Sequence, residues 1–140
     1  MNGLDGVVAA DTVLSDVDGA AGRLVIRGAP LDELAGRVGF EAVAQRLWDG
    51  FFDNLPVDLG PALGRARAEA FEQVGALDAG LRGREPIEAV RALLARLPDG
   101  DDLASGLRFV AGAAVFTAAV GRTRRGAQPV APDPALGHAA

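Results

Sequence analysis

The chain has 140 residues, of which 49% are hydrophobic and 24% charged, and its formal net charge at pH 7 is −5. This length fits one compact domain, and an apolar fraction near one half excludes a disordered tail. The absence of Cys excludes disulfide scaffolds, zinc fingers and thiol nucleophiles. The acidic balance disfavours a nucleic-acid-binding surface, which needs clustered basic residues.

Targeting signals are the next feature that the sequence bears on. The first residues lack a basic stretch and carry Asp5 early, so no secretory signal is predicted. The longest uncharged run near the C-terminus, residues 109–121, has 13 residues, whereas crossing a bilayer takes about 20. The sequence therefore predicts a cytoplasmic protein with no membrane contact.

Residues 1–28 are predicted to contain a β-hairpin. Thr12, Leu14 and Val17 precede a Gly-rich stretch over 18–22, and the apolar residues 24–26 follow it. Two β-prone segments around such a turn are typical of a hairpin.

From residue 29 to residue 126 the pattern predicts helices. Pro30 is expected in a first helical turn, with Asp32 and Glu33 near the positive end of the helix dipole, and this short helix should stop near Gly39. Four further helices are expected over residues 40–50, 61–74, 86–97 and 101–122. Their inward residues are expected to be Phe40, Val43, Ala44 and Leu47, then Leu63, Ala70, Phe71 and Val74, then Ile87, Val90, Leu93, Leu94 and Leu97.

The last predicted helix, residues 101–122, is apolar on nearly every side. One stripe comprises Leu103, Leu107, Val110, Ala114 and Ala118, while Phe109, Val115, Phe116 and Val120 load other faces. Such a helix must be buried on most sides. We expect it to pack against another chain, with burial inside one monomer as the alternative.

Residues 127–140 contain three prolines and are predicted to form an ordered connector or linker. The fold class is therefore mainly α, with an N-terminal β-hairpin followed by a helical bundle.

Few residues are candidates for chemistry. Residues 16–19 resemble part of a calcium loop, but that loop would need acidic ligands at Leu14 and Val25, so a plain turn is favoured. The single histidine, His138, lies close to the end of the sequence, where a terminal or surface role is favoured over that of a catalytic base. Neither Ser15 nor Ser105 lies in a GxSxG elbow.

The charged clusters have structural explanations. Residues 101–102 and 32–33 are acidic pairs at expected helix starts, and the basic run 122–125 is expected to end a helix, with anion or nucleic-acid contact as the alternative. No catalytic, cofactor-binding or metal-binding residue is predicted.

The order of these segments resembles the opening of citrate synthases and 2-methylcitrate synthases. The resemblance is carried by the motif GLDGVVA over residues 3–9, Arg27-Gly28, the helix 31–35 and FEAVAQRLWDG over residues 40–50. Pro86 and Arg91 match a later Pro-Met-x-x-Leu-Arg helix, and residues 122–140 match a connector into the next family helix. The chain departs from the family at Ile26, Glu85 and Ile87, where Tyr, His and Met are frequent.

The resemblance implies a condensation in which acetyl-CoA, deprotonated at its methyl group, attacks oxaloacetate or another 2-oxo acid. The family motifs that hold the working histidines and aspartate do not occur in this sequence. We therefore expect a truncated N-terminal portion or split subunit that is inactive alone, binds no cofactor by itself and associates through helix 101–122 as a homodimer or with a complementary subunit. The alternative is a non-catalytic helical module that pairs with a full-length relative or another partner.

Overall fold

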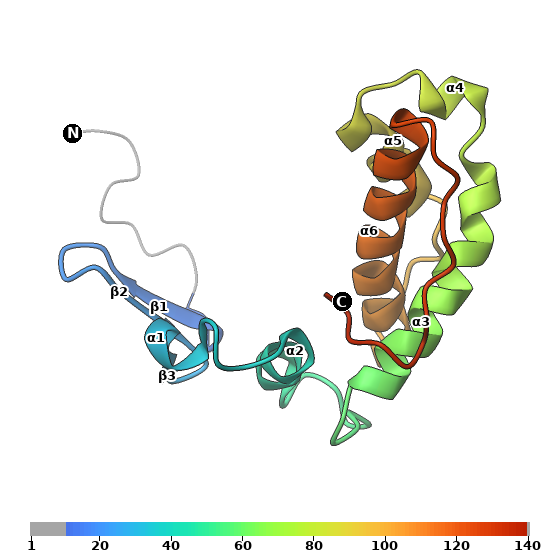
Figure 1. Ribbon diagram of the computed structural model, residues 1–140. Helices are drawn as coiled ribbons and strands as arrows, with labels where there is room; N and C mark the ends of the chain where they lie inside the picture. The colour runs from blue at the N-terminus through green and yellow to red at the C-terminus, as the bar shows by residue number, and fades with distance from the viewer. Residues whose placement is uncertain (1–10, 140) are drawn as a thin grey trace. The chain divides into compact units, whose positions relative to one another are not determined.

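The computed structural model describes residues 11–139 and divides into two compact units that meet in sequence at Gly39 and Phe40 (Figure 1). The first unit contains a three-stranded antiparallel sheet in the order β1 (Ser15–Asp18), β2 (Arg23–Ile26), β3 (Ala29–Pro30). A single helical turn, α1 (Leu31–Leu34), follows the sheet. The part of the predicted hairpin that precedes residue 11 lies outside the described residues.

The predicted hairpin is confirmed as the pair β1 and β2. Ser15 pairs with Ile26 and Asp18 with Arg23. The carboxylate of Asp18 accepts a hydrogen bond of 2.9 Å from the backbone N–H of Ala21, which closes the turn. These acidic residues therefore build a turn, as the sequence favoured.

The third strand corrects the prediction for Pro30. Arg27 and Gly28 both have positive φ, 46° and 80°, and this tight turn brings Ala29 back beside Ile26. Pro30 consequently ends β3 and precedes α1 with φ −58° and ψ 145°, so it lies outside the helix. The helix also ends sooner than predicted, because Gly36 adopts φ 71°.

The second unit is helical and confirms the four longer helices predicted from the sequence. In chain order it contains α2 (Phe40–Trp48), α3 (Gly60–Glu72), the 3-10 turn η1 (Gln73–Ala76), α4 (Ala79–Arg82), α5 (Pro86–Leu94) and α6 (Leu103–Arg124). The turns η1 and α4 were not predicted, since four residues are too few to show an apolar period.

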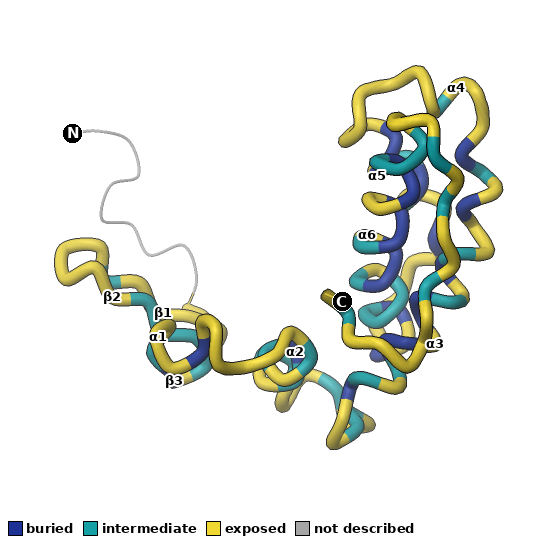
Figure 2. Tube along the Cα trace, in the orientation of Figure 1, coloured by how far each residue is buried: buried dark blue, intermediate teal, exposed yellow. Residues whose placement is uncertain are grey.

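The main core lies where α3 and α5 pack on α6 (Figure 2). Phe116 of α6 and Leu93 of α5 are fully buried there, and a second cluster joins Leu63 of α3 to Ala44 of α2. The predicted inward position of Ile87 is wrong: its side chain is 65% exposed, because it lies in the first turn of α5, before the part that meets α6.

Helix α6 begins with the side chain of Asp102 accepting a 2.8 Å hydrogen bond from the backbone N–H of Ser105. Hydrogen bonds from Ser105 lower the pKa of this Asp102 carboxyl. Among the described residues, α6 is the one helix long and apolar enough to cross a membrane by length and composition. The sequence did not predict this, because the uncharged run considered there, residues 109–121, has only 13 residues. Half of the most apolar stretch of α6 is buried inside the protein, and a core helix passes the same test.

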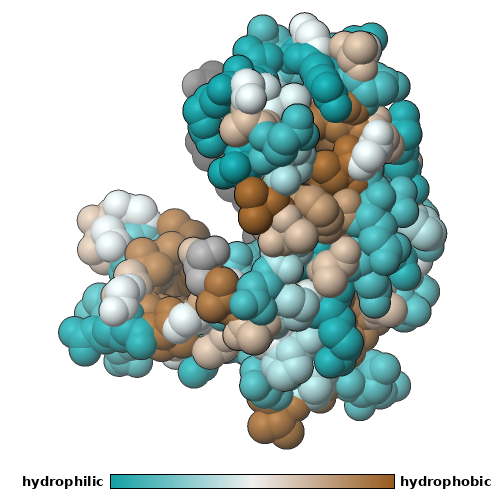
Figure 3. Space-filling view, turned by 45° about the vertical axis from the view of Figure 1, so that its right-hand side comes forward, coloured by the Kyte–Doolittle hydropathy of each residue, from teal (hydrophilic) through white to brown (hydrophobic). Residues whose placement is uncertain are grey.

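Apolar side chains also remain at the surface, as the brown patches of Figure 3 show. The large hydrophobic residues more than half exposed are Val13, Val17, Phe51, Val57, Ile87, Val130 and Leu136. The described part of the chain therefore exposes apolar surface outside its core.

Replacing Phe116 with Ala should destabilise the second unit by about 3–5 kcal/mol, because the ring is fully buried among α3, α5 and α6 and its loss leaves a cavity. Urea unfolding followed by circular dichroism measures this change. The matched control is Phe109→Ala on the same helix, whose ring is 36% exposed and should cost clearly less. Equal losses for the two variants would contradict the assignment of the core.

Candidate functional site

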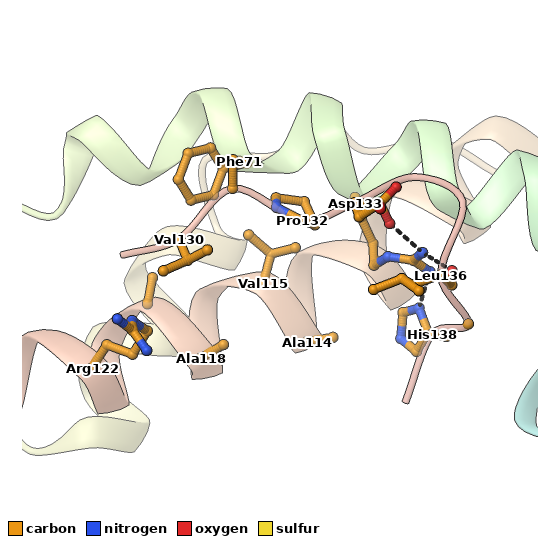
Figure 4. Close-up of a pocket in the computed structure, with 14 residues that line it drawn as sticks. Phe71, Ala114, Val115, Ala118, Arg122, Val130, Pro132, Asp133, Leu136 and His138 are labelled. Atoms are coloured by element: carbon orange, nitrogen blue, oxygen red, sulfur yellow. Dashed lines mark hydrogen bonds between the residues drawn. The ribbon is translucent and has the colours of Figure 1, made fainter. Parts of the chain in front are cut away.

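The segment that follows α6 lies back along the helices of its own unit. We call residues 127–139 the C-terminal segment; it contains turns but no helix or strand. Gly126, at φ 74°, reverses the chain at the end of α6, and the N–H of Ala127 donates to the carbonyl of Arg122 at 3.0 Å. The predicted connector is thus packed against α3 and α6 (Figure 4).

A buried arginine of α3 holds this segment. Arg67 is only 5% exposed, and its guanidinium donates hydrogen bonds to the backbone carbonyls of Leu136 and, at 3.5 Å, Asp133. Because a guanidinium stays charged at any ordinary pH, its burial is tolerable only when such acceptors surround it. The carbonyls of the segment therefore solvate a charge that α3 has placed inside the unit.

His138 contacts three residues of α2 and α3: Phe40, Glu41 and Arg67. Its ring stacks on Phe40, with centroids 4.5 Å apart and planes 17° apart, and its Nδ1 lies 3.4 Å from Nη1 of Arg67. Its backbone N–H donates to the carboxylate of Glu41. The predicted terminal role is correct only in part, since the side chain is half-buried against α2 and α3.

The charges of this cluster set its protonation. Burial lowers the pKa of His138, the nearby Arg67 lowers it further, and Glu41 acts in the opposite direction. The pKa of Glu41 is lowered chiefly by the hydrogen bond from the N–H of His138, against the effect of its own burial. At neutral pH the cluster therefore consists of a neutral imidazole between a guanidinium and a carboxylate.

One face of α3 is shaped for the segment. Gly64, Arg67 and Phe71 follow one another at helical spacing along it. A Cβ on Gly64 would lie 2.1 Å from the carbonyl oxygen of Pro134, so only glycine permits this approach.

The other end of the segment is held by α6. Nε of Arg122 donates to the carbonyl of Gln128 at 2.7 Å, while Arg124 donates to the carbonyl of Arg84 at 2.8 Å. The basic run at the end of α6 thus binds backbone carbonyls of its own chain, in line with the predicted helix-ending role.

A cavity of about 300 Å³ remains between the segment, α3 and α6. Its walls are mostly apolar and include Phe71, Ala114, Val115, Ala118, Val130 and Leu136; Arg67 also lines the cavity, and Arg122 lies at the end away from His138 (Figure 4). Ala114 and Ala118 belong to the stripe predicted to contact another chain, and here they face the segment.

The other candidate residues of the sequence also make structural contacts. In the turn that resembles part of a calcium loop, Oδ2 of Asp16 lies 3.3 Å from Nη2 of Arg23. Within residues 11–139, no three His, Cys, Asp or Glu side chains lie close enough together to hold a metal ion. Ser105 serves the N-terminus of α6 and Ser15 lies in β1. Arg67, Glu41 and Gly64 were missed, although Arg67 falls between Leu63 and Ala70 on the predicted apolar face, where a charged residue signals a buried partner.

Comparison with known proteins identifies the family. The family described as "Citrate synthase, C-terminal domain" matches residues 3–140. The chain is 35% identical over 150 residues to a 2-methylcitrate synthase of Mycobacterium tuberculosis, covering 98% of this chain and 37% of the relative. It is 32% identical over 163 residues to a citrate synthase of Haloferax volcanii, covering 99% of this chain and 41% of the relative. The chain belongs to the citrate synthase family and spans about two fifths of the length of these relatives.

Replacing Gly64 with Ala should loosen the C-terminal segment by about 1–3 kcal/mol, because the new methyl group collides with the backbone of Pro134. Hydrogen exchange of the amides of residues 130–138 measures the loss. Gly75→Ala is the matched control, since a Cβ there meets nothing within 4 Å. Unchanged exchange in the Gly64 variant would show that the segment does not rest on α3.

Proposed function

We propose that this chain provides the N-terminal helical part of a citrate synthase-like acyltransferase. The reaction is the condensation of acetyl-CoA or another acyl-CoA with oxaloacetate or another 2-oxo acid. The observation that carries the proposal is the match over residues 3–140 to a family whose relatives bear the names 2-methylcitrate synthase and citrate synthase. A chain of this family without Cys suits the reducing cytoplasm, which we propose as its location.

The reacting groups are proposed to come from a complementary portion of the enzyme. Enolisation of an acyl thioester needs a positioned base and a donor that stabilises the enolate. The one histidine of this sequence, His138, is occupied by Phe40 and Arg67, and both Arg67 and Arg122 already bind backbone carbonyls. The role that remains for this portion is to build a helical framework, without binding acetyl-CoA by itself.

The purified chain alone should show no condensing activity. Loss of acid–base help costs about 10²–10⁴-fold, and loss of a donor to the developing oxyanion about 10²–10³-fold more. The test is a thiol-release assay with acetyl-CoA and oxaloacetate, run beside His138→Gln prepared in the same way. Turnover that follows the amount of pure chain and disappears in the variant would refute the proposal, whereas equal traces in both preparations come from a contaminant.

We further propose that α6 contacts a second copy of the chain or a complementary subunit. The helix has apolar or small residues on all sides, and Ala113 and Thr117 on its outer face remain exposed. Small side chains on such a face let a partner helix approach closely. The contact is expected at Ala113, because Ala114 and Ala118 already face the C-terminal segment.

Replacing Ala113 with Glu should weaken association at least about tenfold without unfolding the chain, because a carboxylate would be buried unpaired in the contact. Light scattering over a range of concentrations measures this. Ala104→Glu is the control, since Ala104 is exposed on the opposite side of the same helix. A wild-type chain that stays monomeric at high micromolar concentration, or an Ala113 variant that associates like the control, would refute the contact.

A further inference from the structure

Few contacts keep the C-terminal segment docked on α3 and α6. Val130 is 64% exposed and Leu136 54% exposed, so little apolar area is buried when the segment docks. Its prolines at 129, 132 and 134 have no N–H to donate. Elements with little buried apolar surface open at small cost. The attachment therefore depends on the carbonyls bound by Arg67 and Arg122 and on the cluster around His138.

The contact between His138 and Arg67 changes sign with protonation. While the imidazole is neutral, its Nδ1 can accept from the guanidinium 3.4 Å away. Once the imidazole is protonated, both nitrogens are donors and two cations face each other across the same distance. The interaction between His138 and Arg67, which attracts while the imidazole is neutral, thereby becomes repulsive and favours release of the segment.

Besides Arg67 of α3, the charged groups near the His138 ring come from α2, from the C-terminal segment and from α6. Glu41 of α2 attracts the imidazolium, but its carboxylate is already engaged with the N–H of His138. Asp133 of the segment is exposed and its carboxylate accepts from the N–H of Ala135, while Arg122 of α6 lies at the far end of the cavity and adds positive charge. Burial and Arg67 outweigh Glu41, so the pKa of His138 is below its ordinary value.

We propose that the C-terminal segment is a pH-released cover of the groove between α3 and α6, closed by neutral His138 beside Arg67 and opened when that imidazole takes up a proton. The docked state binds fewer protons than the released state, so docking is at full strength above about pH 6.5 and weakens as the pH falls below it. The weakening stops once the pH is below the docked pKa, since both states then carry the proton. Release uncovers the apolar wall that includes Phe71 and Val115.

The composition of the chain makes the test sharp. His138 is its one histidine and Cys is absent, so no other side chain has an ordinary pKa between about 5 and 8. The experiment takes the full chain from about pH 7.5 to about pH 5. Proton NMR follows the His138 ring, hydrogen exchange corrected for its intrinsic pH dependence follows residues 130–138, and a fluorescent dye that binds apolar surface reports the groove.

In the wild type, the ring should titrate below about 6.5, and segment protection should fall by at most about tenfold per pH unit while dye fluorescence rises. In His138→Gln, whose amide oxygen can still accept from Arg67, both changes should vanish. In Glu41→Gln the docked ring should titrate at a lower pH than in the wild type, and the loss of segment protection should extend further as the pH falls, because an attraction for the imidazolium is removed. Circular dichroism at each pH confirms that the helices persist.

Three results would overturn the proposal: release that persists unchanged in His138→Gln, a ring that titrates at or above its ordinary pKa, or a ring that titrates at a higher pH in Glu41→Gln than in the wild type.

Discussion

The packing of the second unit depends on the buried guanidinium of Arg67. A charge that is 95% removed from solvent would be costly unless acceptors replaced its water, and backbone carbonyls of the C-terminal segment do so. Dependence runs in both directions, because the segment has no regular secondary structure and few buried side chains of its own. The helix and the segment are therefore specified together, although about 70 residues separate Arg67 from Leu136 in sequence.

Arginine suits this position in a way that lysine would not. A guanidinium presents several N–H donors in a fixed plane, so one side chain can reach Leu136, Asp133 and the ring of His138 at once. An ammonium has three rotatable donors on a flexible stem and would hold the segment less firmly. Every basic residue of this chain is Arg, and in Arg67, Arg122 and Arg124 the structure uses this property to bind backbone carbonyls.

Sequence periodicity predicted the helices, because their formation depends on residues close together in sequence. It did not predict the contacts between segments that lie far apart in sequence. The helices beginning at Phe40, Gly60, Pro86 and Leu103 follow from apolar spacing, proline at helix starts and the Asp102 cap. Strand β3 depends on two consecutive residues with positive φ, one of them Arg27, and no propensity rule favours that conformation in arginine. The cluster of Glu41, Arg67 and His138 joins three segments far apart in sequence. Arg67 alone gave a local signal, as a cation within an apolar stripe.

The nearly uniform apolar character of α6 can now be divided among its neighbours. Its inward side meets α3 and α5, where Val115, Phe116 and Ala119 are buried. Leu107 and Val110 pack toward the cluster of Ala44, Leu59 and Leu63, and Ala114 and Ala118 face the C-terminal segment. The residues that stay exposed on the middle turns of α6 are Phe109, Ala113, Thr117 and Ala118, so most of the burial that the sequence demanded is satisfied within one chain. An interface on this strip would combine close approach of the small side chains with burial of the Phe109 ring, which is 36% exposed one turn before Ala113.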